Sequence, residues 1–412
     1  MENFNFCVGT RILFGKGQEE KLPELLRPYG NKVLLTYGGG SIKRTGLYDR
    51  IKNLLHEFEI FELGGIEPNP RIESVYAGAE ICREEDIDVI LAVGGGSTID
   101  CSKAIAAAAY YEGDAWDLIL HPDRIEKALP ICTVLTLSAT GSEMDNGGVI
   151  SNLKTKEKLG FGNPLLLPKA SVLNPENTFT VPASQTAAGS ADIMSHILEV
   201  YFDTRNAAVP DRISEGLLKT VIQYAPIAVR EPENYEARAE LMWTSSLAIN
   251  GICSTGKDCA WSCHPMEHEL SAYYDITHGV GLAILTPRWM RYILNEHTVE
   301  KFAEYAKNVW GIAEKADLFE TANAGIDATE EFLKSLEIPM TLSEVGITEE
   351  HFTEMAEHAV IFGGLSEAYV PLKAEDVVNI YRMCNVKNFE EGGNDNGDIT
   401  VKRGLLLDWN CR

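Results

Sequence analysis

The sequence predicts an α/β amino-terminal domain built on a parallel sheet, followed by an all-α carboxy-terminal domain. In the first half, short apolar runs alternate with helical patterns, and glycines mark the changes. Past about residue 183, apolar residues instead recur every three or four positions. The 412 residues also exceed the roughly 250 to 300 that one hydrophobic core accommodates. We therefore expect two domains, residues 1–183 and 184–412.

The elements of the first domain follow from its pattern. "KVLLTYGGGS" (32–41) reads as a strand that runs into a glycine turn, and a helical pattern follows over 42–58. A strand at 59–65 and a helix at 71–85 come next. Residues 88–111 repeat the order of strand, glycine turn and helix, and "ICTVLTLSATGSE" (131–143) supplies a further buried strand. Strands that alternate with helices predict a parallel sheet covered on both faces.

The second domain begins after a connection bracketed by Pro175 and Pro182, which neither helix nor strand tolerates well. Its predicted helical segments are 184–203, 211–229, 233–254, 278–314, 317–336, 348–361 and 373–386. The acidic stretch 389–398 lacks the twelve-residue calcium-loop pattern and is predicted to be an exposed loop.

Composition excludes several classes of partner. The chain has 36 basic and 61 acidic residues, and its net charge of −25 repels nucleic acid and anionic lipid. Its apolar stretches fall short of the roughly 18 residues of a membrane span, and Met1 is followed by Glu2 rather than by a basic leader. The nine cysteines include no C-x-x-C pair, which is typical of reduced thiols. We expect a cytoplasmic protein in which even Cys259 and Cys263, near the histidines, are small buried hydrophobic residues.

Two strands of the first domain end in three glycines and a serine. A helix amino terminus offers unpaired N–H groups, and glycines let a phosphate approach them closely. Neither stretch fits the common dinucleotide or P-loop fingerprints, and one triplet alone predicts no more than a tight turn. Two at the strand ends of one sheet favour a bound dinucleotide. The predicted cofactor residues here are Gly38, Gly39, Gly40, Ser41, Gly94, Gly95, Gly96 and Ser97.

The first turn also indicates which dinucleotide binds. An acidic residue after the first strand would hydrogen-bond a ribose 2′-hydroxyl and repel a 2′-phosphate. This turn has none, and Ser41, Lys43 and Arg44 follow its glycines. Their donors suit a phosphate, which favours NADP over NAD, although the two basic residues could also simply face solvent.

Three of the nine histidines lie within "WSCHPMEHELSAYYDITHGV", residues 261–280. His264 and His268 are four residues apart, as are Asp192 and His196 at the start of the helical half, so each pair shares a helix face. A carboxylate with several imidazoles suits divalent zinc or iron, whereas a structural zinc site would use more cysteines. One histidine alone is more often a hydrogen-bonded core residue, but the joint pattern, with His278, favours a metal site.

Several spaced motifs make the whole chain resemble the iron-containing, or group III, alcohol dehydrogenases, in particular the NADPH-dependent branch of butanol dehydrogenases and aldehyde reductases. They are "NFNFCVGTRILFGKG", "GGGSTIDCSKA", "LSATGSE", "AGSADIMSHILE" and "HPMEHELSAYYDITHGVGLAILTP". The resemblance implies a dehydroquinate synthase-like α/β domain. It also implies a metal held by Asp192, His196, His264 and His278, with His268 near the nicotinamide and the substrate.

The resemblance further implies where the cofactor binds. Gly94 to Ser97 would hold the pyrophosphate, Asp100 would lie by the nicotinamide half, and Lys158 would reach the cofactor. The remaining residues that would line the nicotinamide half are Ser138, Thr140 and Ser142. Asn174 stands where the family usually has Asp, and Pro265 lies between the paired histidines, which puts the orientation of His268 in doubt. The family also implies a homodimer, formed through the amino-terminal strand.

The predicted reaction is reversible hydride transfer between NADP(H) and a small aldehyde or primary alcohol such as butanal or butanol. Fe(II) or Zn would act as Lewis acid, His278 would bind it at the catalytic centre, and His268 or a water chain would deliver the proton. Two alternatives stay open: a dehydroquinate synthase-like lyase that uses NAD and a metal, and a metal or nucleotide sensor without chemistry. The native metal, the aldehyde length and the direction in the cell are not predicted.

Overall fold

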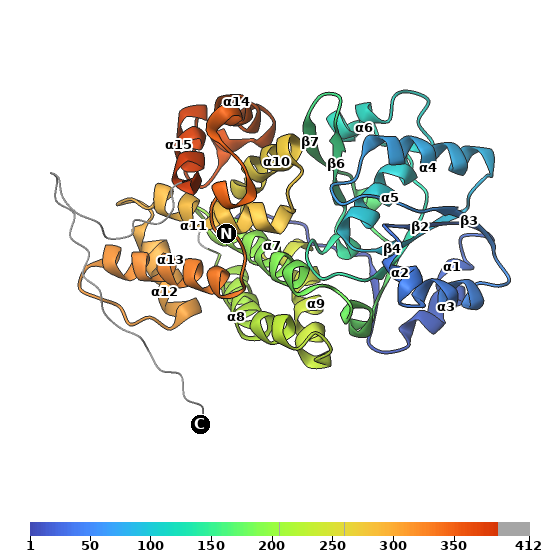
Figure 1. Ribbon diagram of the computed structural model, residues 1–412, viewed down its shortest axis with the longest axis horizontal. Helices are drawn as coiled ribbons and strands as arrows, with labels where there is room; N and C mark the ends of the chain where they lie inside the picture. The colour runs from blue at the N-terminus through green and yellow to red at the C-terminus, as the bar shows by residue number, and fades with distance from the viewer. Residues whose placement is uncertain (206, 259, 386–412) are drawn as a thin grey trace.

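The computed structural model describes residues 1–205, 207–258 and 260–385. An α/β part and a helical part lie beside each other, and the sheet lies inside the first (Figure 1). The predicted exposed loop at 389–398 and Cys259 fall outside the described residues.

A six-stranded sheet forms the centre of the α/β part, in the order β1-β8-β5-β4-β2-β3. Every neighbouring pair of strands is parallel, which confirms the predicted sheet type. The strands are β1 (Arg11–Phe14), β2 (Lys32–Tyr37), β3 (Glu59–Leu63), β4 (Val89–Gly94), β5 (Ile131–Leu135) and β8 (Ala170–Leu173). A separate antiparallel hairpin consists of β6 (Gly147–Asn152) and β7 (Glu157–Gly162).

Apolar residues on both faces of β2 explain why the sheet is covered twice. Val33 and Leu35 pack in one cluster, and Leu34 packs in another, because successive side chains of a strand point to opposite faces. Leu22 of α1 and Ile51 of α3 cover the first face. α4 and α5 cover the second (Figure 1). The helices of this part are α1 (Leu22–Leu26), α2 (Ser41–Arg44), α3 (Leu47–Leu54), α4 (Ile72–Glu84), α5 (Gly96–Ala108) and α6 (Trp116–Leu120).

The helical part contains α7 (Ala183–Tyr201), α8 (Ala208–Arg230), α9 (Tyr235–Ile249), α10 (Cys263–Tyr274) and α11 (His278–Ile293). It continues with α12 (Val299–Trp310), α13 (Leu318–Ser335), α14 (Phe352–Gly363) and α15 (Ala374–Asn385). The division of the chain at residue 183 into two domains stays a prediction.

Two segments predicted as single helical stretches are each broken in the structure. The 42–58 pattern is split by Gly46, whose φ of 75° is a left-handed conformation that glycine tolerates. The 278–314 pattern is split between α11 and α12, since the Thr298 hydroxyl donates to the carbonyl of Ile293 and Asn295 hydrogen-bonds around the same turn. In both segments the helix ends at a glycine or at polar residues, although the apolar residues continue to recur at helical spacing.

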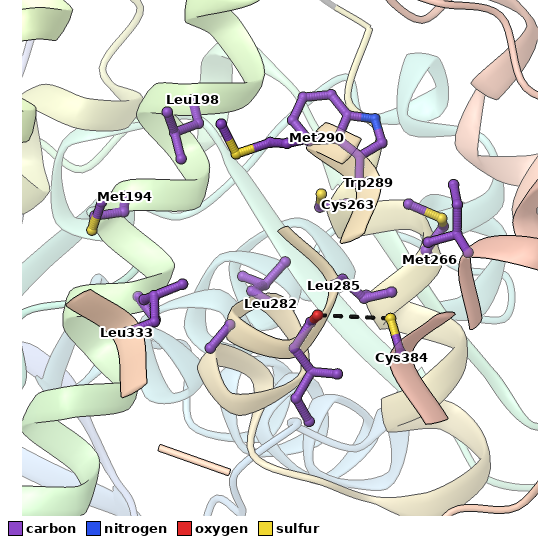
Figure 2. Close-up of a cluster of buried hydrophobic side chains, with 14 of the residues drawn as sticks. Met194, Leu198, Cys263, Met266, Leu282, Leu285, Trp289, Met290, Leu333 and Cys384 are labelled. Carbon is purple, nitrogen blue, oxygen red and sulfur yellow. Dashed lines mark hydrogen bonds between the residues drawn. The ribbon is translucent and has the colours of Figure 1, made fainter. Parts of the chain in front are cut away.

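The helices that carry the metal-site candidates share one core. Met194 and Leu198 of α7, Met266 of α10, and Leu282 and Leu285 of α11 pack in it (Figure 2). Cys263 and Cys384 are fully buried in the same core, and Cys384 donates through Sγ to the carbonyl of Ile284. Cys263 is therefore a small buried hydrophobic residue, as predicted. The opposite faces of these helices are left to form a site.

Among the described residues, none of the helices combines the length and the apolar character that crossing a membrane requires.

Candidate active site

Asp192 is the centre of the histidine cluster. It lies on α7, and His196 follows one turn later, with its Nε2 3.4 Å from Asp192 Oδ1. Every residue of α7 from Thr186 onward is buried, so the polar side chains of this helix lie inside the protein. The two side chains are only 4% and 5% exposed.

His264 and His278 complete the cluster from two other helices. His264 lies in the first turn of α10 and His278 is the first residue of α11. Their Nε2 atoms lie 3.6 Å and 3.8 Å from Asp192 Oδ1. Pro265 is accommodated in the first turn of α10, where its missing N–H has no helical partner. Three imidazole nitrogens therefore surround one carboxylate oxygen, as the sequence pattern predicted.

Several polar atoms of the cluster are buried without a hydrogen-bond partner. These include Asp192 Oδ1 and His264 Nε2. Buried polar atoms are nearly always satisfied in folded proteins, so partnerless atoms aimed at one point indicate a missing ligand. A carboxylate with imidazole nitrogens is the ligand set of divalent zinc or iron. Ligand atoms of Asp192, His196 and His264 all lie within 4.8 Å of one another, so these three side chains fit a divalent cation. His278, whose Nε2 is 3.8 Å from Asp192 Oδ1, lies beside this group.

The local charges and burial favour the metal-binding forms of Asp192 and His196, but the protonated form of His264. Burial acts to raise the pKa of Asp192, but His196 and the other imidazoles outweigh it and hold that pKa well below its ordinary value. Burial, partly offset by Asp192, lowers the pKa of His196 to about 4. Burial also acts to lower the pKa of His264, but Glu199 and Asp192 outweigh it and raise that pKa to about 9. An ionised carboxylate and neutral imidazoles are the species that ligate a cation, which at His264 would displace a proton.

Two buried glutamates that the sequence analysis did not single out contact the cluster. Glu199 Oε1 lies 2.5 Å from Nδ1 of His264, and a carboxylate oxygen of Glu267 hydrogen-bonds Nδ1 of His278. Glu199 is seven residues after Asp192, two turns along the same helix face, and Glu267 is three residues after His264. In the sequence, the signal that these glutamates belong to the site is their helical spacing from a proposed ligand on an apolar helix.

His268 lies beside the cluster rather than in it. Its ring centroid is 6.3 Å from that of His264 and 5.6 Å from that of His278, and its Nε2 is buried without a hydrogen-bond partner. Burial, with the charge of Lys158, lowers the pKa of His268 well below its ordinary value. A neutral imidazole is therefore available next to the proposed ligands.

Lys158 of β7 reaches the cluster from the α/β part. Its Nζ lies 3.2 Å from Glu267 Oε2 and 3.3 Å from Nδ1 of His278. Glu267, His268 and His278 also bring ligand atoms together, but the Lys158 ammonium already lies against this second group. The expected contact between Lys158 and the cofactor stays a prediction.

A groove of about 530 Å³ runs from the first glycine turn to the cluster. Gly38 and Gly39 line one end, Gly95, Gly96 and Ser97 the middle, and Asp192 and His278 the other end. α5 begins at Gly96, so its free N–H groups face this groove. A Cβ at Gly96 would lie 2.3 Å from Oγ1 of Thr140, which explains the glycine. The predicted cofactor residues that do not line the groove are Gly40, Ser41, Gly94, Asp100, Ser138, Ser142 and Lys158.

A second cavity of about 490 Å³ also borders the cluster. It shares Ser97, Thr140 and His278 with the groove and includes His196, His264 and His268. Its remaining wall is largely apolar, with Ile249, Trp261, Ala359 and Phe362. The cluster therefore lies where a long groove meets an apolar cavity.

A buried polar network supports the wall between the two cavities. Asp100 accepts hydrogen bonds from the Ser142 hydroxyl and the Val149 N–H, at 2.6 and 3.0 Å. Fully buried Lys103 donates to Ser142, Asp145 and the carbonyl of Gly147. Burial raises the pKa of Asp100 to about 6, against the opposing charge of Lys103. Asp100 and Ser142 thus lie together at the second cavity, and their expected place beside the nicotinamide half stays a prediction.

Known proteins match the chain over nearly its full length. The family model for iron-containing alcohol dehydrogenase matches residues 9–175, and the model for the carboxy-terminal part of the Fe-containing alcohol dehydrogenase family matches residues 186–384. NADH-dependent butanol dehydrogenase A of Clostridium acetobutylicum is 56% identical over 386 residues, which cover 93% of this chain and 99% of that protein. NADPH-dependent aldehyde reductase YqhD of Escherichia coli is 41% identical over 354 residues, covering 84% and 90%.

Solved structures agree in fold. The crystal structure of NADH-dependent butanol dehydrogenase A from Thermotoga maritima has a TM-score of 0.89 at 40% identity, covering 94% of this chain and 99% of that one. The substrate- and cofactor-free form of the aldehyde reductase YqhD from E. coli has a TM-score of 0.84 at 36% identity, covering 93% and 100%.

Proposed function

The chain belongs to the iron-containing alcohol dehydrogenase family, and on that premise we propose that it transfers hydride reversibly between NADP(H) and small primary alcohols or aldehydes such as butanol and butanal. Membership makes the chain a metal-dependent alcohol dehydrogenase. In this proposal residues 1–183 bind the dinucleotide and residues 184–412 supply the metal ligands.

One observation carries the proposal. The Nε2 atoms of His196, His264 and His278 all lie within 3.8 Å of Asp192 Oδ1, at the junction of the groove and the apolar cavity. A metal held there would face a dinucleotide on one side and a small apolar substrate on the other. Fe(II) and Zn both suit the donor set.

The proposed mechanism assigns each side chain a task. Asp192, His196, His264 and His278 would hold the metal, which when bound would supply a Lewis acid for the substrate oxygen. A nicotinamide bound in the groove would supply or accept the hydride. The glycine turn at Gly95 and Gly96 would hold the pyrophosphate. Thr140, which lines both cavities, and Asp100 and Ser142, which line the second, would position the nicotinamide half.

His268 moves the proton. Its Nε2 is without a hydrogen-bond partner, and the residue lines the same cavity as His264 and His278, where it would exchange a proton with the substrate oxygen directly or through one water. Trp261, Ile249 and Phe362 exclude water and contact the aliphatic chain of the substrate.

NADP(H) is the proposed dinucleotide on the basis of the turn after β2. Residues 38–44 contain no carboxylate, Ser41 is exposed, and the Lys43 ammonium lies 4.7 Å from the ring centroids of Tyr37 and Tyr48. These groups suit a 2′-phosphate. The names of the relatives point both ways: two butanol dehydrogenases at 56% and 52% identity are called NADH-dependent, and YqhD is called NADPH-dependent.

The decisive experiment follows absorbance of the reduced cofactor with metal-stripped protein, butanal, and either Zn or Fe(II) added back. We expect activity only with metal, and a higher kcat/KM with NADPH than with NADH. A Lys43→Met variant should lose rate with NADPH while keeping its rate with NADH. Activity that survives complete metal removal would refute the proposed mechanism, and preference for NADH would refute only the cofactor assignment.

The same assay separates the two alternatives from the proposal. A lyase would recycle its cofactor, so NADPH would not be consumed stoichiometrically with butanal. A sensor with a closed coordination sphere would show no multiple turnover. Family membership favours the dehydrogenase over both.

The proposal includes a homodimer in the cytoplasm. β1 lies at one edge of the sheet, paired only with β8 among the described strands, which leaves a free strand edge for a second copy. The seven cysteines of the described residues are free thiols, as expected in a reducing compartment. Sedimentation equilibrium tests the first point, and cell fractionation tests the second.

A further inference from the structure

We propose that Glu199 and Glu267 are positioning residues that fix the tautomers of His264 and His278, so that both imidazoles present an unprotonated Nε2 to the metal. The inference rests on the proposed ligand set. Fixing a tautomer is a role that the other acidic side chains of α7 and α10 do not have at these two histidines.

Glu199 is saturated by donors. Its Oε2 accepts the backbone N–H groups of Ser262, Cys263 and His264, at 2.7, 2.6 and 3.2 Å. Its Oε1 accepts Nδ1–H of His264 and the Ser195 hydroxyl, at 2.5 and 2.7 Å. One carboxylate thus caps the start of α10 and holds the ring of its first histidine.

This contact decides where the His264 proton resides. An ionised carboxylate can only accept, so Nδ1 of His264 must carry the hydrogen. The neutral ring then has its lone pair on Nε2, the atom 3.6 Å from Asp192 Oδ1. Carboxylates commonly orient metal-bound histidines in this way.

Glu267 holds His278 by a different arrangement. Its Oε2 accepts from Nδ1 of His278 and from the Lys158 ammonium, and its Oε1 accepts the Ser271 hydroxyl. The Nε2 of His278 faces Asp192 Oδ1 at 3.8 Å. His196, by contrast, has a buried Nδ1 without a partner and is held by stacking on His264, with ring centroids 4.6 Å apart.

The two arrangements predict different outcomes of the same isosteric change. In a Glu199→Gln variant the three backbone N–H groups require the amide oxygen at the Oε2 position. The amide NH₂ then faces Nδ1 of His264, which must accept, and the ring proton moves to Nε2. The atom proposed to bind the metal is thereby blocked.

In a Glu267→Gln variant the tautomer is kept. The Lys158 ammonium can only donate, so it holds the amide oxygen at the Oε2 position, beside Nδ1 of His278. The NH₂ faces the Ser271 hydroxyl, which can accept as well as donate. His278 keeps Nδ1–H and a free Nε2.

α10 provides a matched control. Glu269 lies two residues beyond Glu267, is also buried, and makes the same kind of contact, 2.6 Å from Nδ1 of His358. His358 is on α14 and is not one of the proposed ligands. A Glu269→Gln variant therefore removes a buried carboxylate–histidine pair from the same helix without touching the cluster.

The first test measures the Zn(II) dissociation constant of each purified variant by competition with a chromophoric chelator. Loss of a carboxylate that orients a ligand typically weakens binding by about 10- to 100-fold. We expect a loss of about 100-fold for Glu199→Gln, about 10-fold or less for Glu267→Gln, and no change for Glu269→Gln. Equal losses in all three variants, or none in Glu199→Gln, would overturn the inference.

The second test is imidazole nitrogen NMR of isotope-labelled histidines in the metal-free chain, at an alkaline pH at which the wild-type spectrum shows both rings to be neutral. We expect Nδ1–H at His264 and His278 in the wild type, and Nε2–H at His264 only in Glu199→Gln. Nε2–H in the wild type would overturn the inference even if the variants fail to fold. A wild-type chain that binds no Zn(II) would instead refute the proposed ligand set itself.

Discussion

A Gly279→Ala variant tests whether the close packing of α11 against α7 sets the geometry of the ligand cluster. Gly279 directly follows His278, and a Cβ built at this position would lie 2.0 Å from the carbonyl oxygen of Ala188 and 2.5 Å from its carbon. Both are backbone atoms of α7, the helix that carries Asp192. No side-chain rotation relieves such a contact, so a Gly279→Ala change must move one helix away from the other.

The size of the effect follows from these distances. Cβ atoms essentially never come within 3.0 Å of such atoms, so the helices must separate by at least about 1 Å at this point. Overpacking of this kind costs about 1–3 kcal/mol of folding free energy, partly offset by about 1 kcal/mol of helix propensity gained by alanine. A displacement of about 1 Å at a reacting centre can lower the rate about 100-fold. We expect a larger loss in kcat/KM than in stability.

The assay compares kcat/KM for butanal with the urea midpoint of unfolding. Gly216→Ala is the control, because Gly216 is an exposed glycine in α8 where a Cβ would meet nothing within 4 Å. That change should stabilise the fold by about 0.5–1 kcal/mol and leave the rate unchanged. A Gly279→Ala variant with wild-type rate and midpoint would show that the helices are not held at the spacing described.

Three further predictions concern buried polar groups. Burial raises the pKa of Glu143 to about 7, above the ordinary value of about 4.5 that it regains on unfolding, so the unfolded chain loses this proton first as pH rises. Stability should therefore fall by about 3 kcal/mol between about pH 4.5 and pH 7, and Glu143→Gln should flatten this slope in the urea midpoint. Lys103→Met leaves Asp145 buried without its cation and should cost about 3–5 kcal/mol in urea unfolding; a loss below 1 kcal/mol would contradict the role of this ion pair. His268→Asn should lower kcat by about 10²- to 10⁴-fold with unchanged zinc content, and a parallel loss of zinc would instead make His268 a ligand.

Much of the fold could be predicted from local patterns of the sequence. The apolar runs at 32–37 and 89–94 form β2 and β4, and the glycine triplet that follows each one ends its strand. The pattern failed where one residue interrupts a continuous period. Gly46 and the hydrogen bonds of Thr298 end helices that an apolar repeat alone would extend. Such local interactions are not visible in a periodicity.

The candidate site was predictable to the extent that its residues are rare or regularly spaced. Asp192 and His196 share a helix face, and His264 and His278 lie in a short segment rich in histidine, so the four could be named together. Glu199 and Glu267 also stand at helical intervals from proposed ligands, but glutamate is common. The packing of α10 against α7 and α11 decides which carboxylate meets an imidazole. The reach of Lys158 to Glu267 likewise depends on how the hairpin meets α10.

All four proposed ligands belong to one part of the chain, on helices that share the core in Figure 2. A change in the angle between the two parts would therefore widen or narrow the groove without altering any distance within the coordination shell. The contact between Lys158 and Glu267 spans the two parts, so a change in this angle would stretch or break it.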